Sequence, residues 1–279
     1  MTNEQPRLTI DKRSPALWAV TFANPSINLI DAAMIGELQH LLTAAETDDR
    51  LAVIVFDSAD PEFFQAHWDF ADPALKDGLP PGPTGMHPWL DVLVRLSRLP
   101  QVTIAALRGR ARGAGSEFAL AADIRFASRE RAVLAQFELG PGAVPGGGPA
   151  TRLPRLVGRG RALEILMSAD DYDADLAERY GYVNRAIPDA QFVSFVDHFA
   201  QRIARFDVRA IREIKAFVNT VSLPPADEFP PQMDAFFASV ERPATRDRTR
   251  QLFALGLQQR GDAERHLGRY LERLVTPEP

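Results

Sequence analysis

The chain has 279 residues, enough to bury a sizeable core, and its content of 46% hydrophobic and 25% charged residues is typical of a folded globular protein. A formal net charge of −5 argues against general nucleic-acid binding, which depends on a basic surface. Because the sequence has no cysteine, disulfides, thiolate catalysis and cysteine-ligated zinc are excluded. No apolar run reaches the roughly 18 residues of a membrane span, and the N-terminus lacks an apolar signal core, so we expect no membrane partner and a cytoplasmic location.

The first part of the chain predicts a hairpin, a helix and a buried strand. Residues 7–10 and 17–22 alternate loosely between apolar and polar side chains, as two paired strands do. Residues 31–48 place five apolar side chains on one helical face. Residues 51–56 (LAVIVF) are almost entirely apolar, which is typical of a strand in a sheet that is covered on both faces. These elements indicate an α/β fold.

A loop and a second helix follow. Residues 73–85 are rich in proline and glycine and predict a mobile loop. Residues 88–98 predict a helix with Trp89 among the residues on its apolar side. His87, at the start of this helix, is not expected to face a pocket.

Residues 102–122 predict a strand, a glycine-rich turn and the start of a helix. The apolar run 102–107 begins with a β-branched residue, and GRARGAG (residues 109–115) cannot comfortably continue a strand. Small and apolar residues follow from Ser116, with Glu117 early in the expected helix. Such a junction leaves backbone N–H groups unpaired at the positive end of a helix, so it predicts a place to hold an anion or an oxygen that becomes one.

A second carboxylate stands in a similar setting. Glu138 follows a short apolar run, residues 132–137, and the five glycines and two prolines of residues 140–148 exclude regular structure there. One interpretation is that Glu117 and Glu138 are ordinary surface or ion-paired acids. The other is that apolar surroundings raise the pKa of each carboxyl, so that both exchange protons near neutral pH.

The rest of the chain predicts mainly helices. Residues 159–167 and 173–180 are expected helices, the second ended by Gly181, and residues 182–186 are an expected strand. Two further helices are expected within residues 188–218. After a proline-rich linker, the Arg- and Glu-rich remainder predicts helices over residues 233–240, 245–259 and 263–274.

Residues 99–128 (LPQVTIAALRGRARGAGSEFALAADIRFAS) and residues 135–188 resemble the crotonase superfamily, the enoyl-CoA hydratase/isomerase family. The similarity covers about residues 24–188 and has many elements in the right order. It implies a crotonase-like (ClpP/crotonase) ββα spiral core over residues 1–200 and a C-terminal helical segment over residues 201–279. In the family that segment packs against neighbouring subunits, which implies a homotrimer or a dimer of trimers, although the family's usual C-terminal ending is not visible here.

The resemblance implies chemistry on acyl-CoA thioesters, with coenzyme A as part of the substrate and no separate cofactor or metal. The backbone N–H groups of Trp68 and Ala114 align with the two oxyanion-hole donors of the family, which stabilise negative charge on the thioester oxygen. Around them, the resemblance implies a substrate pocket built from Ala66, His67, Gly113, Gly115, Pro145 and Gly146.

Glu117 and Glu138 align with the two acids of the family's hydratases. Their retention favours addition of water to a trans-2-enoyl-CoA, with Glu138 exchanging the α-carbon proton and Glu117, together with Glu138, holding and activating the water. Two alternatives stay open. One is another crotonase-fold reaction, such as isomerisation, hydratase-lyase chemistry or C–C bond hydrolysis. The other is a homologue that binds acyl-CoA without turnover.

His67 departs from the family pattern, because glycine usually stands beside the oxyanion position. Its ring either turns away to hydrogen-bond the backbone, or narrows the acyl pocket or supplies an additional proton donor. Trp68, next to it, is either a pocket wall or a core residue. Asp123, after the helix of Glu117, is expected to be structural and to pair with nearby backbone or Arg.

Overall fold

The computed structural model describes residues 5–77 and 79–274, and a six-stranded sheet lies at its centre. The order in this sheet is β1-β2-β3-β5-β7-β10; β1 and β2 form the expected antiparallel hairpin, and all other neighbours run parallel. The strands are β1 (Leu8–Ser14), β2 (Leu17–Phe22), β3 (Val53–Ser58), β5 (Val102–Leu107), β7 (Ile124–Ser128) and β10 (Arg185–Ile187).

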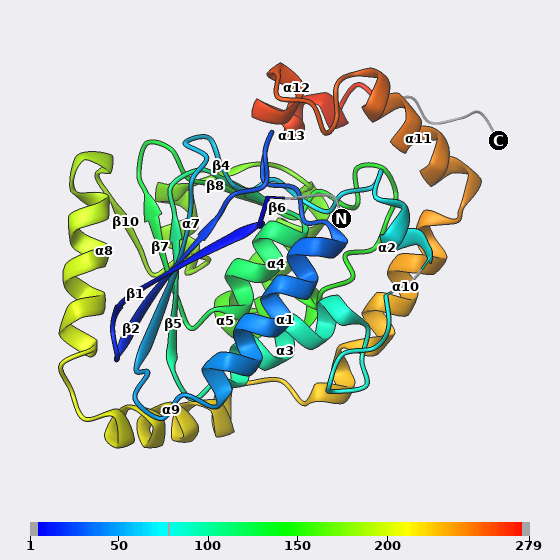
Figure 1. The fold of residues 1–279 in the computed structure, drawn as a ribbon. Helices are drawn as coiled ribbons and strands as arrows, with labels where there is room; N and C mark the ends of the chain where they lie inside the picture. Colours follow the sequence, from blue (N-terminus) through cyan, green and yellow to red (C-terminus); the bar gives the residue numbers. More distant parts are fainter. Residues whose placement is uncertain (1–4, 78, 275–279) are drawn as a thin grey trace.

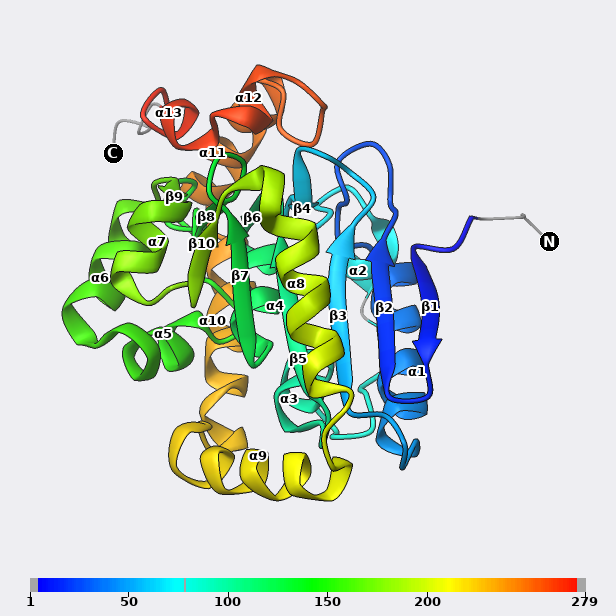
Figure 2. The same ribbon diagram turned by 90° about the vertical axis from the view of Figure 1, so that its left-hand side faces the viewer.

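Helices cover both faces of this sheet, as the apolar strand at residues 51–56 predicts. One face packs against α1 (Ala32–Glu46), α3 (Pro88–Arg98) and α4 (Ala114–Ala121), and the other against α8 (Asp189–Ile203) (Figures 1 and 2). Successive residues of β3 alternate between the two sides. Ile54 and Phe56 lie in the larger core with α1, α3 and α4, whereas Val53 and Val55 pack with α8.

A second, smaller sheet has the order β4-β6-β8-β9, and its strands are β4 (Phe63–Gln65), β6 (Arg110–Arg112), β8 (Val133–Ala135) and β9 (Tyr172–Asp173). The first three run parallel, and β9 is antiparallel to β8. Each of the three follows a strand of the main sheet, which produces the ββα repeat of the crotonase fold. Because β4, β6 and β8 are parallel neighbours, the turns that follow them meet at one edge of the sheet.

The remaining elements are α2 (Pro73–Asp77), α5 (Pro149–Val157), α6 (Arg159–Ser168), α7 (Ala174–Tyr180), α9 (Val208–Ser222), the 3-10 turn η1 (Ala226–Glu228), α10 (Pro230–Val240), α11 (Pro243–Ala254), α12 (Asp262–Arg265) and α13 (Leu267–Leu271). From α9 the chain is helical. It runs along one side through α10 and α11 and returns over the end of the molecule near β4 as α12 and α13 (Figure 1).

Several boundaries differ from the sequence prediction. The helix expected over 245–259 ends at Ala254, and the one expected over 263–274 is interrupted at His266. The proline- and glycine-rich region 73–85 contains the short helix α2, and part of that region, residue 78, lies outside the described residues. α5 was not predicted, because Pro154 inside it argues against a helix.

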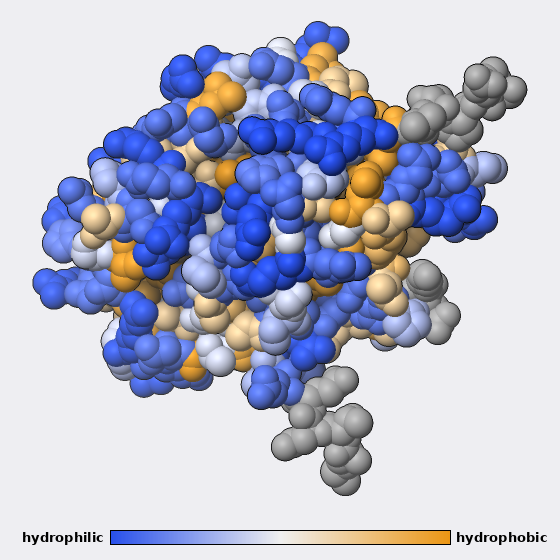
Figure 3. Space-filling model, turned by 90° about the horizontal axis from the view of Figure 1, so that it is seen from above, coloured by the Kyte–Doolittle hydropathy of each residue, from blue (hydrophilic) through white to orange (hydrophobic). Residues whose placement is uncertain are grey.

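No helix in the described part of the chain is long and apolar enough to cross a membrane. The end of the molecule that carries α12 and α13 presents a mostly hydrophilic surface with small apolar patches (Figure 3).

Candidate active site

Three turns meet at the edge of the smaller sheet. Residues 66–68 follow β4, residues 113–114 follow β6, and residues 136–138 follow β8. The structure therefore brings together segments that are far apart in the sequence. They surround a small cavity of about 30 Å³, which is lined by His67, Trp68, Phe70, Trp89, Ala114, Glu117, Phe137, Glu138, Gly146, Gly147, Met233 and Phe236.

Two backbone N–H groups beside this cavity lack an acceptor. Neither the N–H of Trp68 nor that of Ala114 donates a hydrogen bond to any residue in the ranges described. Ala114 is the first residue of α4, so its N–H belongs to the unpaired positive end of that helix. The sharp turn before it is made by Gly113, whose φ of 49° suits glycine. Ala114 itself is not among the positive-φ residues, so alanine is unstrained there.

Glu117 is buried and held by two donors. The indole Nε1–H of Trp89 donates to its Oε2 at 2.8 Å, and the backbone N–H of Gly147 donates to its Oε1 at 2.7 Å. Burial raises the pKa of Glu117, while these two hydrogen bonds and the charge of Arg152 oppose the rise. The contacts orient both carboxylate oxygens and favour the ionised form.

Glu138 is buried with much less support. Its Oε2 has no hydrogen-bond partner among the described residues. Burial, and then the nearby negative charge of Glu117, raise the pKa of Glu138 well above its usual value. The two acids therefore differ: Glu138 favours the protonated form more strongly than Glu117 does.

His67 shows features of both interpretations from the sequence. Its ring lines the cavity, and it also hydrogen-bonds the backbone, with Nδ1 at 2.9 Å from the carbonyl oxygen of Trp68. Its second partner was not predicted: Nε2 lies 2.9 Å from Oε1 of Glu264, in α12. Both side chains are fully buried, at 1% and 0% exposure.

Six of the ten residues expected at the site line the cavity: His67, Trp68, Ala114, Glu117, Glu138 and Gly146. The other four lie just outside it or behind its wall. A side chain at Gly113 would meet Glu138, with a Cβ 2.8 Å from Oε1, and one at Gly115 would meet the backbone of β4. Ala66 is buried in a small cluster with Ile27 and Phe63, and Pro145 precedes the lining residue Gly146.

Two other sequence expectations concern residues away from the cavity. His87 does not line it; its Nδ1 accepts from the N–H of Trp89 at 3.2 Å and caps α3. Asp123 is structural and pairs with backbone, as expected: its Oδ2 accepts from the backbone N–H of Thr103 at 2.8 Å. The hydroxyl of Thr103 and the buried Lys215, whose Nζ lies 2.6 Å from Oδ2, are further partners, and the cation is a lysine where an arginine was the alternative.

Sequence reasoning missed several cavity residues. Trp89 was expected to be only a core residue of its helix, and nothing in its spacing indicates a hydrogen bond to Glu117. Met233 and Phe236 come from α10, more than 90 positions after Glu138, and only the folded chain brings them to the site. Glu264 lies in a charged stretch that resembles an exposed helix.

The donor set of the site is not that of a metal centre. Within the described ranges, no group of three or more His, Cys, Asp or Glu residues could hold a metal ion. The two buried carboxylates and the two open N–H groups instead suit proton transfer beside a carbonyl oxygen that gains negative charge.

The chain is similar to several known proteins. The family described as Enoyl-CoA hydratase/isomerase matches residues 12–245. The chain is 30% identical over 220 residues to carnitinyl-CoA dehydratase from Escherichia coli strain K12, covering 77% of this chain and 82% of that protein. It is 29% identical over 201 residues to short-chain-enoyl-CoA hydratase from Clostridium acetobutylicum, covering 72% and 76%. A Streptomyces avermitilis structure provisionally described as an enoyl-CoA hydratase is 41% identical with a TM-score of 0.90, and 99% of this chain and 100% of that one are covered.

Proposed function

Because this chain belongs to the enoyl-CoA hydratase/isomerase family, we propose that it adds water to the double bond of a trans-2-enoyl-CoA thioester. One observation carries the proposal: two buried glutamates with different hydrogen-bond support line the same cavity. Coenzyme A is part of the substrate, and the proposed reaction needs no other cofactor and no metal.

The proposed oxyanion hole consists of the N–H groups of Trp68 and Ala114. Attack at the β-carbon moves negative charge onto the thioester oxygen, and two fixed donors stabilise it. The N-terminal end of α4 adds a favourable dipole. The support for this assignment is that neither N–H has an acceptor in the described protein and that both residues line the cavity.

The two acids divide the proton transfers. Glu117, as a carboxylate, accepts a proton from water while the water oxygen bonds to the β-carbon. Glu138, as the protonated acid, gives its proton to the α-carbon of the resulting enolate. The product is a 3-hydroxyacyl-CoA, and one proton passes from Glu117 to Glu138 through solvent to restore the starting state. The different pKa values of the two carboxyls support this division.

The same groups run the reaction in both directions. One relative is named for dehydration and another for hydration, and removal of water from a 3-hydroxyacyl-CoA is the reverse of the proposed step. Equilibrium and substrate supply decide which direction dominates, so the proposal covers both.

The test uses a panel of aliphatic and aromatic trans-2-enoyl-CoA thioesters and follows the loss of the conjugated enoyl absorbance. Glu117→Gln and Glu138→Gln are expected to lower kcat by about 10² or more, because each removes one proton-transfer group. Glu272→Gln is the matched control, since Glu272 is exposed at the end of α13. A rate that Glu138→Gln leaves unchanged contradicts the assignment. A product other than the 3-hydroxyacyl-CoA indicates another reaction of the family, and binding without turnover indicates a binding role.

We also propose that the chain assembles into a trimer or a dimer of trimers. The support is α9, where Phe217 and Val221 are 77% and 86% exposed and the exposed Ile214 lies one turn before Phe217. Such an apolar surface is typical of an interface between subunits. Light scattering after size-exclusion chromatography measures the assembly, and Phe217→Glu is expected to shift it towards the monomer.

A further inference from the structure

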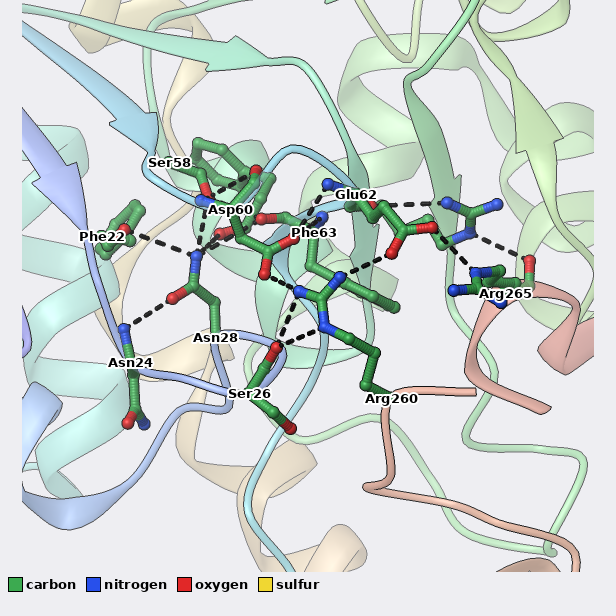
Figure 4. A network of polar contacts seen from close by, with 12 residues as sticks. Phe22, Asn24, Ser26, Asn28, Ser58, Asp60, Glu62, Phe63, Arg260 and Arg265 are labelled. Carbon is green, nitrogen blue, oxygen red and sulfur yellow. Dashed lines mark hydrogen bonds and ion pairs between the residues drawn. The ribbon is translucent and has the colours of Figure 1, made fainter. Parts of the chain in front are cut away.

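The C-terminal segment is anchored on the turn that follows β3. Arg260 forms ion pairs with Asp60 and with Glu62, the latter at 2.5 Å, and donates to the carbonyl oxygen of Ser26 at 2.8 and 3.0 Å (Figure 4). Arg265 donates to the other oxygen of Glu62 at 2.8 Å. These contacts hold both ends of the stretch 260–265 against the turn before β4, and β4 leads directly to Trp68.

Between these anchors, Glu264 points inward. Its side chain is completely buried, and its Oε1 accepts from the backbone N–H of Gln258 at 2.6 Å and faces Nε2 of His67 at 2.9 Å. Its backbone carbonyl accepts from Arg112 at 2.6 Å, and Arg112 in turn forms a bidentate pair with Asp171 at 2.6 and 2.7 Å. Both hydrogen bonds of the carboxylate are made by Oε1, and Oε2 has no partner among the described residues, so a positive charge on His67 offsets the cost of burying this carboxylate.

Both nitrogens of the His67 ring face an acceptor: the carbonyl oxygen of Trp68 and the carboxylate of Glu264. A neutral imidazole has only one N–H and would leave one of these acceptors unpaired, whereas the protonated ring donates to both. Burial lowers the pKa of His67, but the charge and hydrogen bond of Glu264 and the bond to Trp68 outweigh it and raise the pKa above the usual value. The geometry and the charges agree on an imidazolium.

This ring fixes the backbone on one side of the Trp68 N–H. On the other side, the carbonyl oxygen of His67 accepts from the N–H of Ile30 at 2.9 Å. In a trans peptide the C=O and N–H point in opposite directions, so this bond also sets the direction of the Trp68 N–H. The peptide that carries the proposed oxyanion donor is therefore held at both ends.

We infer that His67 and Glu264 are positioning residues, through which the C-terminal segment holds the Trp68 N–H in place for the thioester oxygen. The inference rests on the proposed function, because it assumes that a thioester binds in this cavity. It does not depend on which reaction follows, since negative charge on the thioester oxygen would be stabilised in the same way. Neither residue touches the reacting atoms in this scheme. The charged groups around the ring are Glu264 from α12, Arg112 from β6 with its partner Asp171, and Glu138 across the cavity wall.

The central variant is Glu264→Gln, which keeps the shape and an acceptor but removes the charge. The expected result is a fall in kcat of about tenfold to a hundredfold with KM within about twofold, because a small displacement of a catalytic group costs up to about 10² in rate. Asp262→Asn is the matched control. It removes a charge from the same helix, where the side chain of the exposed Asp262 pairs with Tyr270 and His266. Equal effects of the two variants overturn the inference.

The pH profile separates positioning from mere loss of structure. The imidazolium is present below the pKa of His67 and is lost as pH rises through it, so kcat falls on the alkaline side. Without the charge of Glu264, burial dominates and lowers that pKa, and the alkaline limb of the Glu264→Gln variant moves to lower pH. The imidazole chemical shifts of His67 report the same pKa without any turnover. The inference is overturned if Glu264→Gln changes neither the pH of the alkaline limb nor the pKa that the His67 chemical shifts report.

A double variant covers the case in which Glu264→Gln does not fold. His67→Gln/Glu264→Gln replaces the ion pair with two neutral amides, and it is expected to fold and to bind the enolate of acetoacetyl-CoA more weakly than the wild type; binding as tight as that of the wild type overturns the inference. Acetoacetyl-CoA is the probe that separates it from the hydratase proposal, because its enolate carries charge on the thioester oxygen. Weaker enolate binding by Glu264→Gln supports positioning even if no enoyl-CoA is hydrated. If the wild type hydrates an enoyl-CoA and both proteins bind the enolate equally well, the positioning role is overturned and the hydratase proposal stands.

Discussion

The indole of Trp89 donates to Oε2 of Glu117 at 2.8 Å, whereas Oε2 of Glu138 has no partner among the described residues. Two carboxyl groups that line one cavity thus receive unequal support. A donor to the charged form lowers a carboxyl pKa, so Trp89 helps to keep Glu117 ionised, while burial and the charge of Glu117 raise the pKa of its neighbour Glu138 well above the usual value. The tryptophan lies in α3, outside the three turns that form the rest of the site.

Trp89→Phe keeps an aromatic ring but removes the N–H. The pKa of Glu117 is then expected to rise further. A group that works as a carboxylate loses activity as pH falls through its pKa, so the acidic limb of kcat/KM moves to higher pH. We expect kcat to fall by about tenfold, since a hydrogen bond to a charged group contributes about 1.5–3 kcal/mol. Trp18→Phe, in the buried strand β2, is the matched control. Superimposable pH profiles for Trp89→Phe and the wild type count against this role.

Gly147→Ala tests the second donor to Glu117. A Cβ at residue 147 would lie 2.0 Å from Oε2 of Glu117, so the carboxylate must move. We expect kcat to fall by about 10², as for a misplaced catalytic group. Gly160→Ala in α6 is the control, because a Cβ there meets nothing within 4 Å. The control is expected to keep full activity and to raise Tm slightly, since alanine favours a helix. Normal activity of Gly147→Ala would show that Glu117 does not need its observed position.

Glu138→Gln tests the cost of burying that carboxyl. The pKa of Glu138 is higher in the folded protein than in the unfolded chain, where it is about 4.3. As pH rises from the unfolded-state pKa through the folded-state pKa, the group therefore lowers the free energy of unfolding. The variant is expected to be more stable than the wild type at pH 7 and equal to it near pH 4. The gain is about 1.4 kcal/mol for each pKa unit of the shift. Urea unfolding at the two pH values measures it, and an equal difference at both would contradict the pKa assignment.

Arg112→Met removes a fully buried cation. Asp171 and the carbonyl oxygen of Glu264 then lose their partner, and we expect the free energy of unfolding to fall by about 3 kcal/mol, as for other broken buried pairs. Arg129→Met is the control, because its ion pair with Asp175 is exposed and is worth less than about 1 kcal/mol. Denaturant unfolding of both variants provides the comparison. A loss no larger than that of the control would mean that the buried network contributes little.

Sequence patterns predicted the longer helices and strands whose apolar residues recur at a clear spacing. The bounds of α3 and β5 agree with prediction at both ends, and α1 differs by one or two residues, because apolar spacing and flanking Pro, Asp and Gly mark them clearly. The strands β4, β6 and β8 were not predicted as a sheet. With three residues each, they are too short to show an alternating pattern, and only pairing with one another defines them.

The site was predictable where a backbone turn marks it and unpredictable where a distant side chain completes it. Glycine-rich turns indicated the places of Ala114 and Glu138, and the resemblance supplied Trp68. The partners Trp89 and Glu264 carry no local signal, since an apolar helix face and a charged helix look ordinary in sequence. Their roles arise from tertiary packing, which brings α3 against Glu117 and α12 against His67.

The contact between His67 and Glu264 spans 197 positions of the chain. Closing a loop of that length costs about 5 kcal/mol of chain entropy, so this contact forms late, after the sheets have brought the two ends together. We therefore expect tryptophan burial in the core to precede the recovery of the proposed activity during refolding. We expect a chain with a complete core and an undocked α12 to be folded by most spectroscopic criteria and still inactive, because the Trp68 N–H is then not held in place.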